Sequence, residues 1–226
     1  KQNLSPEAQT LSPRILGVFP KRWMWILMFP FANQPGMRFV NAVKYYLGRI
    51  LDKGKPYLQS LVGFNFLLDY VPNWKNIYLP DGFIQHQSFV PHANAETTIA
   101  QILEITHKYR MPPFLAVFKR HRADPFLMTH GLDGYSLALD FPINKKSRGR
   151  ILDMTAEIDA LICAAGGRFY PAKDATLIGE TYQKSLPRES IEDFLALKTK
   201  LDPDGLIRTD LSERLFNHGP HNPGIL

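Results

Sequence analysis

The chain has 226 residues, of which 45% are hydrophobic and 12% aromatic, a composition that supports a packed core and excludes a disordered polypeptide. Its single cysteine, Cys163, excludes an intrachain disulfide framework and is typical of a reducing compartment, so we expect a cytoplasmic protein. The net charge of +6 is compatible with a nucleic acid or a membrane as partner, but the basic residues are spread along the chain, with some concentration from 21 to 55.

An apolar run from Trp23 to Phe29 follows an irregular entry segment at residues 1–20. The run is too short to span a bilayer, and no small-residue cleavage site marks it as a secretory signal. Its aromatic residues, with Lys21 and Arg22 beside them, would suit a peripheral contact with a membrane surface. Burial of the run as a strand or helix is the favoured interpretation.

Two further elements are expected before residue 80. From Met37 to Leu51 apolar side chains recur at helical spacing and Gly54 lies just past the end, which predicts a helix. Residues 60–70 are apolar and aromatic, and the pattern leaves strand and helix open.

From residue 82 onward the pattern alternates between strands and helices. Strands are predicted at residues 82–90, 113–121, 135–141 and 168–170, and helices at 95–109 and after Ser147. This βαββαβ order predicts an α+β fold of the ferredoxin-like type, an antiparallel sheet with both helices on one face. The other face is then free to meet a ligand, another domain or solvent.

Polar side chains alternate along three of these strands, so each strand places its polar set on one face. A solvated outer face is the ordinary explanation, but this mixture beside Phe83, Leu115 and Val117 also resembles the wall of a pocket. The sets are Gln85 and Gln87 on the first strand, Lys119 and His121 on the second, and Ser136, Ala138 and Asp140 on the third.

The tail supplies a helical extension. Helices are predicted at residues 190–201 and 210–216, the second with Asp210 and Glu213 at capping spacing, and residues 202–205 form a turn by composition. His218 and His221 have no evident third ligand, so we expect a frayed tail and no metal site.

Lys173 lies in the stretch Gly166–Ala175, where two glycines end a helix, a short strand follows and Pro171 is expected to turn the chain out of the sheet. A lysine at such a position can be held rigidly toward a cofactor. The alternative is a solvated turn lysine.

Three motifs of the chain resemble the C-terminal half of FAD-linked oxidases of the vanillyl-alcohol oxidase superfamily, and most closely its decaprenylphosphoryl-ribose oxidase group. The resemblance runs from about Leu61 to Phe216. The motifs are G-F-I-Q-H-Q-S-F-V-P at 82–91, G-G-R-F-Y-P-A-K-D at 166–174 and L-D-P-D-G-L-I-R-T-D-L-S-E-R-L at 201–215.

The resemblance implies that the chain contains two regions of such an oxidase and lacks a third. Residues 1–168 would form a substrate-binding cap, and residues 169–226 a returning segment that completes an N-terminal FAD-binding domain. That domain is expected to be missing from this chain, because no glycine-rich stretch suits the diphosphate of FAD. The chain alone should therefore bind FAD poorly or not at all.

The resemblance also implies roles for single residues. Lys173 matches the lysine that lies against the flavin ring and substrate, and Tyr170 the tyrosine that contacts the flavin. Substrate-binding positions fall on Gln85, Gln87, Lys119, His121, Ser136, Ala138 and Asp140. Three of these depart from the family pattern, since Ser136 and Ala138 replace an asparagine and a cysteine and His121 replaces an aromatic residue. The preferred substrate is expected to differ accordingly.

The implied chemistry is oxidation of a hydroxyl carbon of a sugar or a lipid-linked sugar by hydride transfer to FAD. Lys173 would either stabilise negative charge on the reduced flavin or accept the hydroxyl proton as a general base, and the sequence leaves both roles open. Two other functions compete. A basic ferredoxin-like sheet can bind single-stranded RNA, but the aromatic residues of that motif are missing, so no nucleic acid is expected. A membrane-docking structural fragment is the other alternative.

Overall fold

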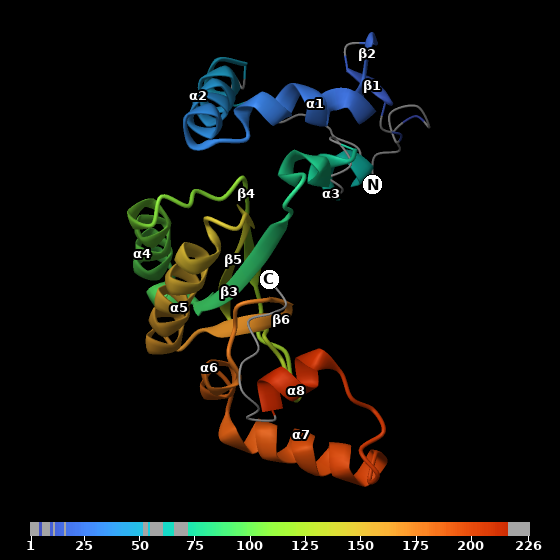
Figure 1. Ribbon diagram of the computed structural model, residues 1–226, viewed down its shortest axis with the longest axis vertical. Coiled ribbons are helices and arrows are strands. Elements are labelled where there is room, and N and C mark those ends of the chain that lie inside the picture. Colours follow the sequence, from blue (N-terminus) through green and yellow to red (C-terminus); the bar gives the residue numbers. More distant parts are fainter. Residues whose placement is uncertain are drawn as a thin grey trace. The chain divides into compact units, whose positions relative to one another are not determined.

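Our computed structural model describes residues 5, 10, 12–15, 17–51, 54, 61–65 and 72–216, and the chain divides into two units, Lys1–Gly82 and Phe83–Leu226. Figure 1 shows the elements of each unit. The boundary predicted at residue 168 concerns function and stays a prediction; in the structure Arg168 begins a strand. His218 and His221 lie outside the described residues.

The first unit is mainly helical. Its elements are β1 (Arg14–Ile15), β2 (Phe19–Pro20), η2 (Lys21–Trp23), α1 (Met24–Met28), η3 (Phe29–Phe31), α2 (Gln34–Leu51), α3 (Leu61–Asn65) and η5 (Trp74–Tyr78). The entry segment is therefore not wholly irregular, because β1 and β2 pair across Gly17, whose φ is +74°. The stretch at 60–70 is helical where it is described, and residues 60 and 66–70 lie outside the described part.

Helix α2 begins three residues before the predicted start. Asn33 Oδ1 accepts a 2.9 Å hydrogen bond from the Gly36 amide and so caps the first turn. A side chain at Gly36 would lie 2.5 Å from the carbonyl oxygen of Phe31, which explains why the sharp entry from η3 needs glycine. The rings of Phe31 and Phe39 then stack with centroids 5.8 Å apart, joining η3 to α2.

The expected burial of the run from Trp23 to Phe29 is wrong. The run is helical, but Trp23, Ile26, Leu27 and Phe29 are each about half exposed, and no residue of α1 is buried. The run is only five residues of α-helix between two short 3₁₀ turns, all five apolar, and so short a helix cannot bury every side of itself.

The second unit has the predicted fold. Its elements are β3 (Phe83–Pro91), η6 (His92–Asn94), α4 (Ala95–Lys108), β4 (Leu115–His121), β5 (Gly134–Pro142), α5 (Arg148–Ala164), β6 (Arg168–Asp174), α6 (Gly179–Lys184), α7 (Arg188–Leu201) and α8 (Asp210–Phe216). The four strands are antiparallel in the order β4-β5-β3-β6, which is the ferredoxin-like arrangement.

One face of this sheet packs on α4 and α5, which lie side by side in Figure 1. Alternate residues of β3 and β5 reach that core, together with the apolar stripe of α5. They include Ile84, Val90, Leu137, Leu139, Phe141, Ile151, Met154, Ile158 and Ile162. A buried pair, His86 Nε2 and Asp159 Oδ1 at 2.7 Å, joins β3 to α5 within this layer.

Strand β6 continues past Pro171 as far as Asp174, so the prediction that proline ends the strand is wrong. β6 is an edge strand, and a proline there costs no ladder hydrogen bond on its outer side. Its pairing with β3 shifts register between His86 and Ser88, which marks an irregularity at this point. The extra length carries Lys173 along the sheet instead of leaving it in a turn.

Candidate functional site

The sheet face opposite α4 and α5, called here the polar face, carries all seven predicted substrate-binding residues. Across the strands Gln85 lies opposite Asp140, and Lys119 lies opposite Ser136. On β3 and β5 the companion residues lie in the helix-covered core, as the alternation predicts. On the edge strand β4 the companions Ala116 and Phe118 are exposed instead. The seven are Gln85, Gln87, Lys119, His121, Ser136, Ala138 and Asp140.

Asp140 has an unusual environment on this face. Its side chain is held by β5 and is only 2% exposed, and Gln85 Nε2 donates a 2.8 Å hydrogen bond to Oδ1. The second oxygen, Oδ2, is the buried side-chain polar atom of the described residues that has no hydrogen-bond partner. Burial raises the pKa of Asp140, while the Gln85 hydrogen bond and the Lys173 charge oppose that rise. A buried oxygen without a donor is a position where a ligand hydroxyl can bind.

Lys173 lies on the same side of the sheet as Asp140. The two charges interact, and the Lys173 ammonium is half-buried. Burial lowers the pKa of Lys173, Asp140 opposes this shift, and the charge of Lys119 adds to it. Lysine and carboxylate therefore face one region from different strands, each with its ionised form penalised by burial. Burial thus moves the pKa of Asp140 up and the pKa of Lys173 down, toward each other.

Ser136 connects two other predicted residues. Its hydroxyl accepts a 3.2 Å hydrogen bond from Gln87 Nε2 and lies 2.7 Å from His121 Nε2. Burial lowers the pKa of His121, and the charges of Lys119, His130 and Arg120 lower it further, so the ring is neutral at pH 7. The Ser136 hydroxyl can then accept from Gln87 and donate to an unprotonated Nε2. This chain of contacts fixes the orientation of the Gln87 amide.

The remaining predicted residues frame these two groups. Ala138 is buried on β5 between Ser136 and Asp140, and its methyl group fills little volume there. Lys119 is exposed, and its charge lowers the pKa values of both His121 and Lys173. Lys119 and Lys173 thus both place positive charge beside the polar face.

The sequence interpretation missed an aromatic cluster at one end of the polar face. His130 lies in the loop at residues 122–133. Its ring centroid is 4.8 Å from that of Phe89 and 4.7 Å from that of Tyr170. Phe89 also lies 4.8 Å from the ring of His121. Phe89 shares the alternation of Gln85 and Gln87 and could have been found by it, whereas no periodicity marks a loop residue such as His130.

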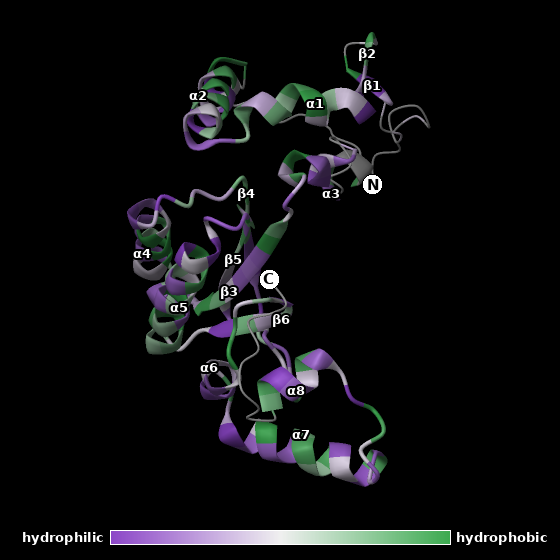
Figure 2. Cartoon of the chain, in the orientation of Figure 1, coloured by the Kyte–Doolittle hydropathy of each residue, from purple (hydrophilic) through white to green (hydrophobic). Residues whose placement is uncertain are grey.

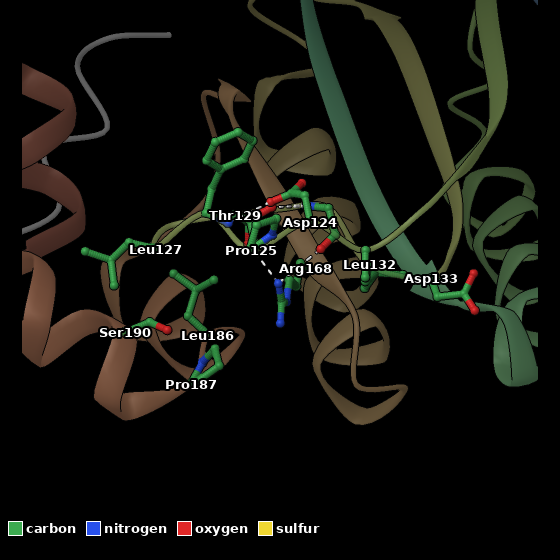
Figure 3. A pocket seen from close by; sticks show the side chains of 13 residues that line it. Asp124, Pro125, Leu127, Thr129, Leu132, Asp133, Arg168, Leu186, Pro187 and Ser190 are labelled. Carbon is green, nitrogen blue, oxygen red and sulfur yellow. Dashed lines mark hydrogen bonds between the residues drawn. The ribbon is translucent and has the colours of Figure 1, made fainter.

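Arg168 holds the loop that carries His130. Its guanidinium donates to the carbonyl oxygens of Thr129 and Gly131, at 3.0 and 3.2 Å, and Figure 3 shows the Arg168 side chain directed at the loop. A cavity of about 300 Å³ opens beside it, lined by the loop and by the junction of α6 and α7 at Leu186 and Pro187. None of the predicted site residues lines this cavity. Arg168 therefore positions the aromatic cluster from the side away from Asp140.

Comparison with known proteins found similar sequences, and no family model matches the chain. The chain is 30% identical over 159 residues to decaprenylphosphoryl-beta-D-ribose oxidase of Mycolicibacterium smegmatis. The matched residues make up 70% of the chain and 33% of the oxidase. An uncharacterised protein in the mprA 5′ region of Streptomyces coelicolor is 32% identical over 82 residues, covering 36% of the chain and 21% of that protein. The chain spans about a third of the length of the oxidase, and over this span it is an oxidoreductase-like region distantly related to that enzyme.

Proposed function

We propose that the chain is the substrate-binding and C-terminal part of an FAD-dependent oxidoreductase that oxidises a hydroxyl carbon of a sugar, or of a polyprenyl-phosphate sugar. One observation carries the proposal: Asp140 Oδ2 is buried without a donor in the region that Lys173 and Gln85 also face. A substrate hydroxyl would complete that oxygen's hydrogen bonding. The distant relation to an oxidase of a polyprenylphosphoryl pentose supports this class of substrate.

The residues present fit the ring portion of FAD. Lys173 offers a half-buried ammonium that interacts with Asp140, and Tyr170 on the same strand offers a ring that packs on His130. Both match the family positions that contact the flavin. When bound, FAD would supply the acceptor for the hydride that leaves the carbinol carbon. The diphosphate would be held mainly by a domain outside these residues.

The chain's own groups divide the remaining work. Gln85 fixes the Asp140 carboxylate through Oδ1, so Oδ2 is directed at the hydroxyl that is oxidised. As the carbon becomes a carbonyl the hydroxyl gives up its proton, and Asp140 Oδ2 and the amine of Lys173 are the two acceptors within the region. The raised pKa of Asp140 and the lowered pKa of Lys173 bring both groups closer to neutrality.

Substrate orientation falls to the other predicted residues. Gln87, whose amide is held through Ser136, would bind sugar hydroxyls. Lys119 is exposed and lies opposite Ser136 across the strands, and it would meet the phosphate of a lipid-linked sugar. The small side chain of Ala138, between Ser136 and Asp140 on β5, would place little bulk against the sugar ring.

Direct binding to the 226-residue chain tests this assignment without FAD. A short-chain polyprenylphosphoryl pentose is titrated by calorimetry into the chain, into Asp140→Ala and Gln87→Ala, and into Asp153→Ala, which replaces an exposed carboxylate on the far side of α5. Binding is expected to fall by about tenfold in each site variant, the equivalent of one lost good hydrogen bond, and to stay unchanged in the control. Equal affinity in all four proteins would place the substrate elsewhere.

The RNA-binding alternative is less well supported by the same face. Base stacking needs aromatic rings that are accessible on the central strands. Phe89 on β3 is 1% exposed and packs against two histidine rings, so its face is not offered to a base.

A further inference from the structure

Helix α2 has two chemically distinct faces. Apolar side chains recur three and four residues apart along its 18 residues, which places them on one side of a helix with 3.6 residues per turn. They are Phe39, Val43, Tyr46, Leu47, Ile50 and Leu51, called here the apolar face of α2. Arg38, Lys44 and Arg49 flank that face on both sides. Figure 2 shows hydrophobic and hydrophilic residues along the length of α2.

The apolar face of α2 is exposed. No residue of the helix is buried, and Ile50 and Leu51 are 70% and 74% exposed. An amphipathic helix of a globular protein ordinarily buries this stripe against a core, so the exposed stripe indicates a surface that acquires its cover by binding. The half-exposed side chains of Trp23, Leu27 and Phe29 belong to the segment that precedes α2.

The charge of this segment identifies the kind of surface that fits. Residues 8–51 contain six basic residues, Arg14, Lys21, Arg22, Arg38, Lys44 and Arg49, and no aspartate or glutamate. A second copy of the chain placed on the same face would bring like charges together, which disfavours self-association. A surface with negative charges and an apolar layer beneath them would match both the basic residues of this segment and the apolar face of α2.

We propose that α2 lies in the interface of a membrane that contains anionic lipid, with its apolar face in the acyl boundary and its arginines and lysine at the headgroups. This is the arrangement of interfacial amphipathic helices, whose long basic side chains reach the phosphates while their stems cover apolar surface. Among the described residues no helix has the length and apolarity that a membrane span requires. The helix therefore rests on the bilayer without crossing it.

Vesicle sedimentation of the 226-residue chain tests the proposal. Vesicles of phosphatidylcholine alone are compared with vesicles of equal parts phosphatidylcholine and phosphatidylglycerol. The wild-type chain is expected to sediment with the anionic vesicles only, and its tryptophan emission to shift to shorter wavelength, since all three tryptophans lie in the first unit. Arg38→Gln/Arg49→Gln is expected to bind more weakly by about fivefold per lost charge.

Substitution of the apolar face gives the decisive comparison. Leu47→Asp/Ile50→Asp is expected to lower vesicle binding by at least about tenfold, because two side chains leave the acyl boundary and two negative charges are added. Leu201→Asp is the control, since Leu201 is 72% exposed, much like Ile50 at 70%, but ends α7 in the second unit. Far-ultraviolet circular dichroism of each variant checks that its helices are intact.

Three results would overturn the proposal. They are failure of the wild-type chain to bind anionic vesicles, unchanged binding of Leu47→Asp/Ile50→Asp, and a wild-type dimer in sedimentation equilibrium that the same double variant dissociates without any vesicle binding. The last result would assign the face to a second copy. No turnover or sugar binding enters these measurements, so this proposal and the proposed oxidation fail independently.

Discussion

Gln85 on β3 donates a 2.8 Å hydrogen bond to one carboxylate oxygen of Asp140 on β5 and leaves the other oxygen, which is buried, without a donor. Burying a carboxylate that is only partly satisfied is costly in free energy of folding. Such a cost is typical of binding sites, where a ligand completes what the folded chain leaves open. Asp140 is therefore expected to reduce stability while it serves function.

Asp140→Asn is expected to raise the stability of the chain. The amide removes the buried charge, and its oxygen can still accept from Gln85, so the free energy of unfolding should rise by about 1 kcal/mol. Thermal unfolding followed by circular dichroism measures the change, with Asp153→Asn, an exposed carboxylate, as a control that should not shift. A lower melting temperature for Asp140→Asn would mean that Asp140 is a structural residue.

Lys173→Ala is expected to lower turnover by at least about tenfold in the complete flavoprotein while FAD remains bound, because a positioned charge or base contributes at least that much. Steady-state kinetics with the flavin absorbance recorded in parallel measures both quantities. Lys200→Ala, which replaces an exposed lysine of α7, is the control. Near-normal turnover in Lys173→Ala would remove this lysine from the mechanism.

Stability is expected to fall as the pH falls below about 6.5, because burial lowers the pKa values of His121 and His130 from that ordinary value. In that range the unfolded chain binds more protons than the folded chain, so the folded state loses stability on acidification and keeps it above about pH 6.5. Melting temperatures across this range measure the slope. His121→Asn/His130→Asn should flatten the slope, and an unchanged slope would assign it to other groups.

Two glycine substitutions are expected to have opposite effects. A side chain at Gly134, at the start of β5, would lie 2.0 Å from the backbone oxygen of Val90, so Gly134→Ala should destabilise the sheet by about 2 kcal/mol. Gly149 in α5 has open space around its Cβ position, and Gly149→Ala should stabilise the helix by about 0.5 kcal/mol. Denaturant unfolding of both variants checks the pair, and equal effects would contradict the register of β3 and β5.

The fold of the second unit could be predicted because its strands and helices differ clearly in period. The period-two spacing of Gln85 and Gln87, and of Ser136, Ala138 and Asp140, was sufficient to place each strand's set on one face, and the register confirms that these sets lie opposite each other. The cap of α8 was assigned to the wrong residues: Thr209 and Ser212 exchange the capping hydrogen bonds. Both pairs have the same spacing, so spacing alone could not distinguish them.

Other features depended on tertiary context. Pro171 is tolerated within β6 because the strand lies at the sheet edge, and the order of strands is not written in local sequence. His130 reaches Phe89 because Arg168 holds its loop. The hydrogen bond from Arg168 to Thr129 that does so joins residues 39 positions apart. The exposed apolar run at Trp23 resembled a buried segment because composition does not reveal what lies against a helix.

The rate at which a polyprenylphosphoryl pentose bleaches the flavin of the complete protein, in the absence of oxygen, tests the central claim most directly. The account predicts rapid bleaching in wild type and in Asp153→Asn, and bleaching at least about tenfold slower in Asp140→Asn with FAD still bound. Bleaching of Asp140→Asn at the wild-type rate would contradict the assignment of the polar face as the site of hydroxyl oxidation.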